Sequence, residues 1–368
     1  MSEGLEGVVA TETKLSRVDG AAGRLIVAGH DIEELAGHWR LSEVAALLWS
    51  TADGQSWNAD RVSEGLGLAR VYANSLVPRF LSVTEGASPV EALRTGWSLL
   101  KDSEPEAENL DVSLLLSGAA PVFLAAHYRH MQGMSLIAPN PDRDHAEDYL
   151  AMLGLDHTPV PARAFERYLI TVADHGTNAS TFTSRVVAST LAGEISSVVA
   201  ALCALKGPLH GGAPGPVLDM FDEIGGMQNI VPWIEHELDG GSRLMGFGHR
   251  VYRTCDPRAD ILKGIVGSLD QSTDRMQFAE ALERAVLDAL AAKYPNRRLD
   301  TNVEYYTALV LDGVGLPREL FTPAFAMGRV FGWCAHIKEQ VAGGRLIRPS
   351  SRYTGTLPEG AVALQMAG

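Results

Sequence analysis

Two histidines stand among glycines between Lys206 and Arg258, and this arrangement is the first sign of chemistry in the sequence. His210 occurs in KGPLHGGAPG, and His249 occurs in MGFGHRVYRTCDPRA. Glycine lets the backbone approach a ligand closely, and an imidazole can donate or accept a proton near neutral pH. We therefore expect the two loops to form two walls of one active site.

A carboxylate follows the two histidines along the chain. Glu304 lies in TNVEYYTALVL, a pattern that predicts a helix capped by Thr301 or Asn302, with Glu304 in its first turn. Two imidazoles and a carboxylate could remove a proton from a carbon next to a carbonyl group. A lone histidine at a helix end, or a lone first-turn carboxylate, has a structural explanation, so the three residues support a site only as a set.

Three arginines could bind a ligand that carries carboxylates, because guanidinium groups match carboxylates bidentately. Arg258 lies in DPRA and could instead be an ordinary helix-start residue. Arg329 lies on an otherwise apolar helix, where its charge needs a ligand or an ion-pair partner. Arg348 lies in the basic tail RLIRPSSRYTG, which could simply face the solvent.

Metal and dinucleotide chemistry find no support in the sequence. His175, His210 and His249 show no HExxH or CxxC spacing that would indicate zinc. GFGHRV is not a full GxGxxG motif and follows no clear strand, so it does not indicate a dinucleotide fold. We therefore expect no metal site.

The elements that must position these residues are mostly helical. From Asp31 onward, apolar residues recur at spacings of three and four, and strands do not alternate with helices. Residues 5–30 alternate short β-branched runs with turn signals, which predicts a small hairpin region. ISSVVAALCALKG is apolar almost all round and predicts a buried helix. ADHGTNAS predicts a break at His175–Gly176, followed by a helix capped by Asn178.

The length and composition of the chain further limit the possible functions. A chain of 368 residues predicts two domains, or a large domain with a smaller one attached. The formal charge of −14 argues against nucleic-acid binding, although a few arginines can still dominate the potential inside a cleft. Three widely spaced cysteines fit a reducing cytosol, and no signal-peptide pattern or apolar run of roughly 20 residues occurs. We expect a cytoplasmic protein that binds neither nucleic acid nor a membrane.

Five segments together resemble the signature segments of citrate synthases, in the same order and spacing. They are ADHGTNASTFTSRV, KGPLHGGA, MGFGHRVYRTCDPRA, TNVEYYTALVL and RPSSRYTG. The opening LEGVVATETKLSRVDGAAGRLIVAGHDIEELA is similar to the N-terminal segment of that family. The resemblance covers nearly the whole chain, and five ordered motifs carry weight that no single one would.

The resemblance implies an all-α homodimer with a short N-terminal β-hairpin region. A large helical domain would comprise residues 1–210 plus 315–368, and a small helical domain would comprise residues 211–314. The active site would lie between them and would be completed by the partner subunit. Closure of the small domain would exclude water during the reaction.

The resemblance also implies a reaction of the tricarboxylic acid cycle, in which acetyl-CoA, oxaloacetate and water give citrate and CoA. No cofactor would be bound permanently, because the CoA thioester is a co-substrate. Glu304 would remove the α-proton, His210 would donate a hydrogen bond to the thioester oxygen, and His249 would polarise the ketone of oxaloacetate.

Binding roles follow from the same resemblance. His175 would contact oxaloacetate or the product, Arg258 and Arg329 would hold its carboxylates, and Arg348 would reach in from the partner subunit. Arg297 and Arg298 could meet CoA phosphates or lie in a solvated loop. The adenine of CoA would lie against the backbone of Leu244, Met245, Gly246, Phe247 and Gly248.

Two departures from the family pattern keep alternatives open. The family usually has Asp where this chain has Glu304, and an Asn is more common where Pro214–Gly215 follows HGGA. A carboxylate misplaced by about 1 Å can cost on the order of a hundredfold in rate. The residue at Glu304 leaves a weakly active or non-catalytic CoA-binding relative as an alternative. A 2-methylcitrate synthase that uses propionyl-CoA is another, because the two enzymes share these motifs and one methylene in a pocket is worth only about 1–3 kcal/mol.

Overall fold

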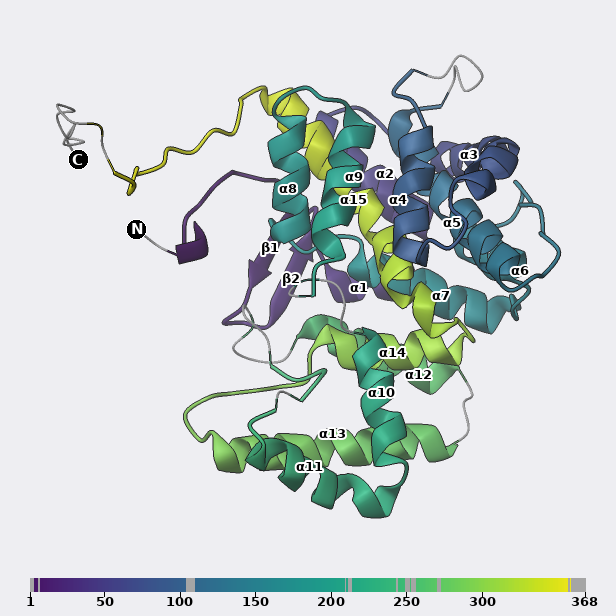
Figure 1. The fold of residues 1–368 in the computed structure, drawn as a ribbon. Helices are drawn as coiled ribbons and strands as arrows, with labels where there is room; N and C mark the ends of the chain where they lie inside the picture. The colour runs from purple at the N-terminus through teal and green to yellow at the C-terminus, as the bar shows by residue number, and fades with distance from the viewer. Residues whose placement is uncertain are drawn as a thin grey trace.

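The computed structural model describes residues 3–5, 7–103, 110–208, 210, 214–242, 244–248, 252, 256–269, 273–356 and 358. Fifteen α-helices and one small sheet make up this part of the chain, which confirms the expected all-α class (Figure 1). The helices are α1 (Ile32–His38), α2 (Leu41–Asp53), α3 (Ala59–Ser82), α4 (Pro89–Leu99), α5 (Val112–Met131), α6 (His145–Leu153), α7 (Pro159–Val172), α8 (Ala179–Ala188), α9 (Glu194–Leu205), α10 (Pro214–Ile224), α11 (Ile230–Asp239), α12 (Pro257–Ser268), α13 (Thr273–Lys293), α14 (Val303–Gly313) and α15 (Phe321–Gly343).

The N-terminal sheet extends the predicted hairpin by one short strand. Strands β1 (Ser16–Asp19) and β2 (Arg24–Val27) pair antiparallel, and β3 (His30–Asp31) pairs with the other edge of β2. Leu25 and Val27 point into the core, while their neighbours on β2 do not, as expected for a half-buried strand. The sheet leads directly into α1.

The centre of the larger helical group is α15, which packs against α2, α5, α7, α8 and α9. Trp333 is fully buried on it, and Trp49 of α2 donates a hydrogen bond from Nε1 to the carbonyl oxygen of Phe331. Two glycines let α15 approach the end of α7 closely. A Cβ on Gly328 would lie 2.6 Å from Cγ2 of Val172, and one on Gly332 would overlap the carbonyl oxygen of Ala173.

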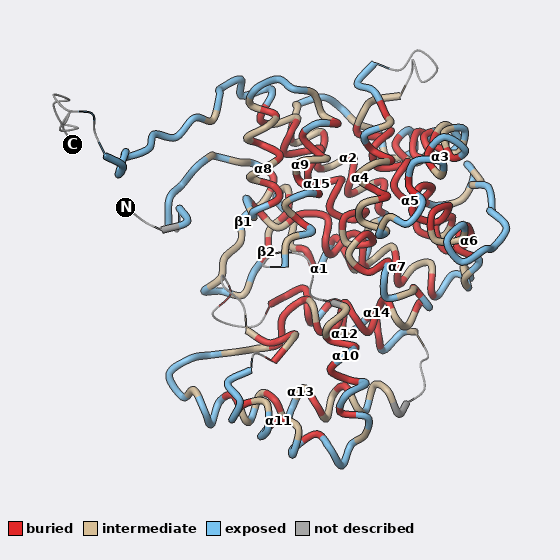
Figure 2. Tube along the Cα trace, viewed as in Figure 1, coloured by how far each residue is buried: buried red, intermediate tan, exposed pale blue. Residues whose placement is uncertain are grey.

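A second group of helices lies below the first in Figure 1. Helix α10 packs on α14, and α11 packs on α13, while α12 and α14 lie against α7 of the larger group. One continuous hydrophobic cluster includes residues of both groups, and Figure 2 shows buried stretches inside the upper group and along α12 and α14. The junction of the two groups therefore lies at α7, α12 and α14.

The expectation of an all-round buried helix after residue 194 is wrong for α9. Ile195, Val198 and Leu202 are buried, but Ser196 and Cys203 are exposed. The outer face keeps small apolar residues such as Ala200, so hydropathy alone did not distinguish it from the inner face. Within the described residues, no helix combines the length and the apolar character needed to cross a bilayer.

Candidate active site

His210 is held by the N-terminus of α8. Its Nε2 accepts a hydrogen bond from the backbone N–H of Ser180 at 3.2 Å and lies 2.8 Å from the Ser180 hydroxyl. A backbone N–H can only donate, so Nε2 carries no proton, and the proton of the neutral ring is on Nδ1. The Nδ1–H has no hydrogen-bond partner among the described residues. The ring can therefore donate one hydrogen bond to a ligand.

Burial keeps His210 neutral. Loss of contact with water lowers the pKa of its imidazole to about 4, and the positive charge of Arg329 adds to the effect. A neutral imidazole can donate to a carbonyl oxygen without giving up a full proton. Such a donor stabilises negative charge that develops on that oxygen.

Ser180 and Trp333 form a support for His210 that the sequence did not reveal. Trp333 donates from Nε1 to the Ser180 hydroxyl at 3.2 Å, and that hydroxyl lies 2.8 Å from Oδ1 of Asn178. Asn178 caps α8 as predicted, because its Oδ1 accepts the backbone N–H of Thr181. The sequence does not predict this contact of Trp333, because no local pattern relates it to a serine about 150 residues earlier.

Arg329 is a buried cation without an ion-pair partner among the described residues. Its side chain is 2% exposed, its Nε donates to the carbonyl oxygen of Val172 at 2.6 Å, and its guanidinium lies 4.8 Å from the Phe325 ring centroid. Burial lowers its pKa to about 10, although Asp174 counteracts this. A buried guanidinium without a carboxylate is costly unless a ligand supplies one. The burial of Arg329 therefore favours a ligand over a structural ion pair as the partner of its guanidinium.

Arg258 is buried beside Arg329 but has a carboxylate of its own. Its Nε and Nη2 donate to the two carboxylate oxygens of Asp256 at 3.0 and 2.8 Å. Burial opposes the charge, yet Asp256 outweighs it, and the pKa of Arg258 is raised. Glu304 contributes to that rise, while the charges of Arg258 and Arg329 disfavour each other. An anion between the two guanidinium groups would relieve this repulsion.

The other predicted residues divide into those near this cluster and those away from it. His175 follows α7 and lies 3.1 Å, through Nε2, from the hydroxyl of Tyr252. Glu304 is in the first turn of α14, where Asn302 caps its backbone N–H at 2.9 Å. Arg348 is exposed on the extended segment after α15, which leads away from the body in Figure 1. His249 lies outside the described residues.

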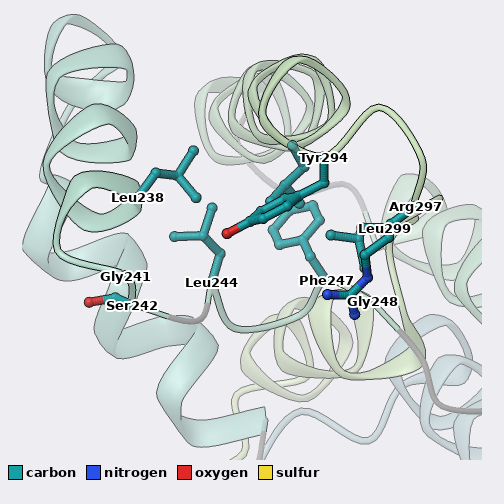
Figure 3. Close-up of a pocket in the computed structure, with 10 residues that line it drawn as sticks. Leu238, Gly241, Ser242, Leu244, Phe247, Gly248, Tyr294, Arg297 and Leu299 are labelled. Carbon is teal, nitrogen blue, oxygen red and sulfur yellow. The ribbon is translucent and has the colours of Figure 1, made fainter.

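A pocket of about 420 Å³ lies beside the glycine loop that precedes His249 (Figure 3). Leu244, Phe247 and Gly248 line it, while Gly246 is buried against Tyr305 and Met245 is half-buried. Facing the loop are one aliphatic side chain from each of α11 and α13 and, from the segment that follows α13, an aromatic ring, a further aliphatic side chain and a guanidinium. These facing residues are Leu238, Leu290, Tyr294, Arg297 and Leu299. A flat aromatic group with an attached anion fits this lining.

Within the described residues, no cluster of three or more His, Cys, Asp or Glu side chains is arranged to hold a metal ion. The geometry instead combines a neutral imidazole donor, a carboxylate at a helix start and two buried guanidinium groups. Together these groups could act on a carbonyl compound that bears carboxylates, and they indicate an all-helical enzyme of that class.

Comparison with known proteins identifies the family. A family model described as "Citrate synthase, C-terminal domain" matches residues 4–350, and the chain belongs to the citrate synthase family. The citrate synthase of Deinococcus radiodurans is 36% identical over 367 residues, 96% of either chain. The 2-methylcitrate synthase 2 of Corynebacterium glutamicum is 34% identical, over 96% of this chain and 94% of that one.

A solved structure agrees with the fold. The citrate synthase of Thermoplasma acidophilum, in its ternary complex with carboxymethyl coenzyme A and oxaloacetate, superposes with a TM-score of 0.85 at 30% identity. The match covers 99% of this chain and 98% of that chain. The likeness thus extends over both helical groups, including the junction at α7, α12 and α14.

Proposed function

We propose that this protein condenses acetyl-CoA with oxaloacetate and water to give citrate and CoA. The observation that carries the proposal is the state of His210, a neutral imidazole with its proton on Nδ1, held by Ser180 next to a buried arginine. Its Nδ1–H donates to the thioester oxygen while Glu304 removes a proton from the acyl methyl group. The resulting enolate carbon attacks the ketone carbon of oxaloacetate, whose oxygen is polarised by His249. Water then hydrolyses citryl-CoA.

Oxaloacetate is held by its two carboxylates. Arg329 is buried and has no ion-pair partner among the described residues, which supports its assignment to one of them, and Arg258, oriented by Asp256, binds the other. His175 contacts oxaloacetate or the product, with its ring oriented by Tyr252. A carboxylate of oxaloacetate between Arg258 and Arg329 would offset the repulsion between their charges.

CoA is a co-substrate, and no permanently bound cofactor takes part. The pocket beside the loop of Leu244 to Gly248 supports a place for the adenine, between that loop and Tyr294. Arg297 at the rim of the pocket binds a phosphate of CoA. The solvated-loop alternative for Arg297 is weaker, because its side chain lines the pocket.

The working unit is a cytoplasmic homodimer, in which Arg348 completes the partner's site. The segment that carries Arg348 leads away from the candidate residues of the same subunit, which supports a role in the other subunit. Partly exposed apolar residues on α8 and α9, among them Phe182, Val186 and Val199, offer a surface for the partner. Residues 211–314 form a small domain that closes on residues 1–210 plus 315–368 and excludes water.

A specific observation keeps 2-methylcitrate synthesis as a second candidate. One of the relatives is named a 2-methylcitrate synthase, and one methylene in a pocket is worth only about 1–3 kcal/mol. Purified protein is mixed with oxaloacetate and either acetyl-CoA or propionyl-CoA, and free thiol is followed. A higher kcat/KM with acetyl-CoA supports citrate synthesis, and a preference for propionyl-CoA moves the assignment to 2-methylcitrate.

The same assay tests whether the protein is catalytic at all. Release of no thiol from either acyl-CoA, together with intact CoA binding, would favour a non-catalytic CoA-binding relative. Equilibrium binding of CoA, measured by calorimetry, provides the second arm. The replacement of the family's usual Asp by Glu304 makes this alternative worth the test.

A further inference from the structure

Backbone hydrogen bonds tie the pocket loop to the residues that lead into α14. The N–H of Gly248 donates to the carbonyl oxygen of Asp300 at 2.8 Å, and the N–H of Asn302 donates to that of Gly246 at 2.9 Å. Phe247 and Thr301 form an isolated antiparallel bridge between these bonds. The loop that precedes His249 and the start of the Glu304 helix therefore form one short ladder.

The side chain of Asn302 adds one contact to the loop and one to the first turn of α14. Its Nδ2 donates to the carbonyl oxygen of Gly248 at 3.0 Å, and its Oδ1 accepts the backbone N–H of Glu304 at 2.9 Å. The residue is 4% exposed. One buried amide thus contacts the residue next to His249 and the residue assigned as the base.

The loop also lies in close contact with α14 at Gly246. Gly246 has φ +85°, and a Cβ there would lie 2.9 Å from Cδ2 of Tyr305. Only glycine adopts this backbone conformation without strain while lying so near the aromatic ring. The loop is therefore shaped by α14 as well as bonded to it.

Glu283 of α13 also contacts the start of α14. Its Oε1 accepts from the Thr301 hydroxyl at 2.7 Å, and its Oε2 accepts from the Tyr306 hydroxyl at 2.6 Å and from Lys263 at 3.0 Å. Thr301 and Tyr306 flank Glu304 in the chain. A single carboxylate therefore binds side chains on both sides of the proposed base in the chain.

We propose that Asn302 is a positioning residue that joins the CoA-binding loop to the helix carrying the base, so that CoA binding and the placement of Glu304 are coupled. This inference rests on the proposed function, in which the loop binds CoA and Glu304 removes the proton. A displacement of about 1 Å at the base can cost on the order of a hundredfold in rate. A rigid connection between loop and helix start keeps such a displacement from occurring when CoA binds.

The test uses Asn302→Ser in the full-length protein. Serine can still cap α14 through its hydroxyl, but it has no amide N–H to donate to Gly248. We expect the KM for acetyl-CoA to rise about three- to tenfold, because the loop that binds CoA loses one hydrogen bond that holds it in place, and one such bond is worth about this factor. We expect kcat to fall about ten- to a hundredfold, while the KM for oxaloacetate stays within about twofold.

The matched control is Asn58→Ser, at the N-cap of α3, where the asparagine oxygen also accepts two backbone N–H groups. This residue lies outside the proposed site, so all three kinetic constants should match those of the wild type. The rate with trideuterated acetyl-CoA separates positioning from general loosening. Misplacement of Glu304 slows proton removal and raises the primary isotope effect in Asn302→Ser, whereas a purely structural change does not.

Kinetics of Asn302→Ser that match those of Asn58→Ser would overturn the proposal, as would a raised KM for acetyl-CoA with an unaltered kcat and isotope effect. If Asn302→Ser does not fold, Asn302→Asp, which keeps the capping oxygen and loses the N–H donor, replaces it under the same criteria. If the wild type itself releases no CoA, the proposed function fails, and the role of Asn302 is then tested by measuring CoA binding to wild type and variant by calorimetry. Equal affinity in wild type and variant overturns the coupling, and a severalfold loss supports it.

Discussion

At the scale of single residues, the protonation state of His210 controls both stability and chemistry. Burial places the pKa of its imidazole near 4 in the folded protein, below the value of about 6.5 in an unfolded chain. Between these values the unfolded state binds more protons, so the free energy of unfolding rises with pH. His210 therefore stabilises the fold fully above about pH 6.5 and loses this contribution as the pH falls toward 4.

We predict that His210→Asn flattens the dependence of stability on pH in this window. Urea midpoints of wild type and variant are compared at pH 7 and pH 5. The wild type should lose more stability than the variant between the two, because only the wild type must keep the position-210 imidazole neutral. Parallel losses in the two proteins would contradict the assigned burial effect.

Glu304 supplies the second prediction at this scale. Glu304→Gln keeps the length of the side chain but removes the base, so condensation should fall by about 10²-fold or more. Binding of oxaloacetate, measured by calorimetry, should stay largely intact, because Arg258 and Arg329 are unchanged. Glu34→Gln, which removes an exposed carboxylate from the first turn of α1, is the control and should leave turnover unaltered. Full turnover in Glu304→Gln would refute the assignment of the base.

At the scale of elements, the sequence predicted best those features that depend on neighbouring residues in the chain. The caps by Asn178 and Asn302 are confirmed, because a cap depends on residues two or three positions away. The support of His210 by Ser180 and Trp333 was not predicted, because three segments far apart in the chain must meet to form it. The roles of the catalytic and binding residues themselves remain predictions.

The contact between α7 and α15 is another feature that no local pattern revealed. Gly328 and Gly332 look like ordinary glycines of an apolar helix, which usually weaken a helix. In the structure they allow α15 to approach the backbone at Leu169 and Ala173. This approach brings Arg329, which lies between them, to the carbonyl oxygen of Val172.

We predict that Gly332→Ala destabilises the protein by about 1–3 kcal/mol, because the added methyl group would overlap the carbonyl oxygen of Ala173. The same displacement should move Arg329 and raise the KM for oxaloacetate, whereas the KM for acetyl-CoA should change little. Urea unfolding and steady-state kinetics measure the two effects. Gly37→Ala in α1 is the matched control, since nothing lies within 4 Å of its added Cβ, and it should be neutral or stabilising by up to about 1 kcal/mol.

At the scale of the whole molecule, the candidate residues come from both helical groups. His175, His210 and Arg329 belong to the end of α7, the residues after α9, and α15, whereas Arg258 and Glu304 belong to α12 and α14. The ordered family motifs allowed the fold class and the family to be predicted from the sequence. Which side chains from the two groups would touch, such as His175 and Tyr252, depends on how α12 and α14 lie against α7, and no pattern in the sequence encodes that.

The exposed position of Arg348, on a segment that leads away from its own site, gives a prediction for the assembly. Arg348→Gln and Glu304→Gln should each be nearly inactive as homodimers. Random reassembly of an equimolar mixture gives half heterodimers, and one of the two sites in each heterodimer contains both wild-type residues. If Arg348 acts in the partner's site, the mixture should regain about a quarter of the wild-type activity. If it acts in its own site, every site of a heterodimer carries one of the two substitutions, and mixing restores nothing.

The measurement is thiol release after the two variants are unfolded together and refolded, with each variant refolded alone as the control. A mixture no more active than its components would contradict the contribution of Arg348 across the dimer.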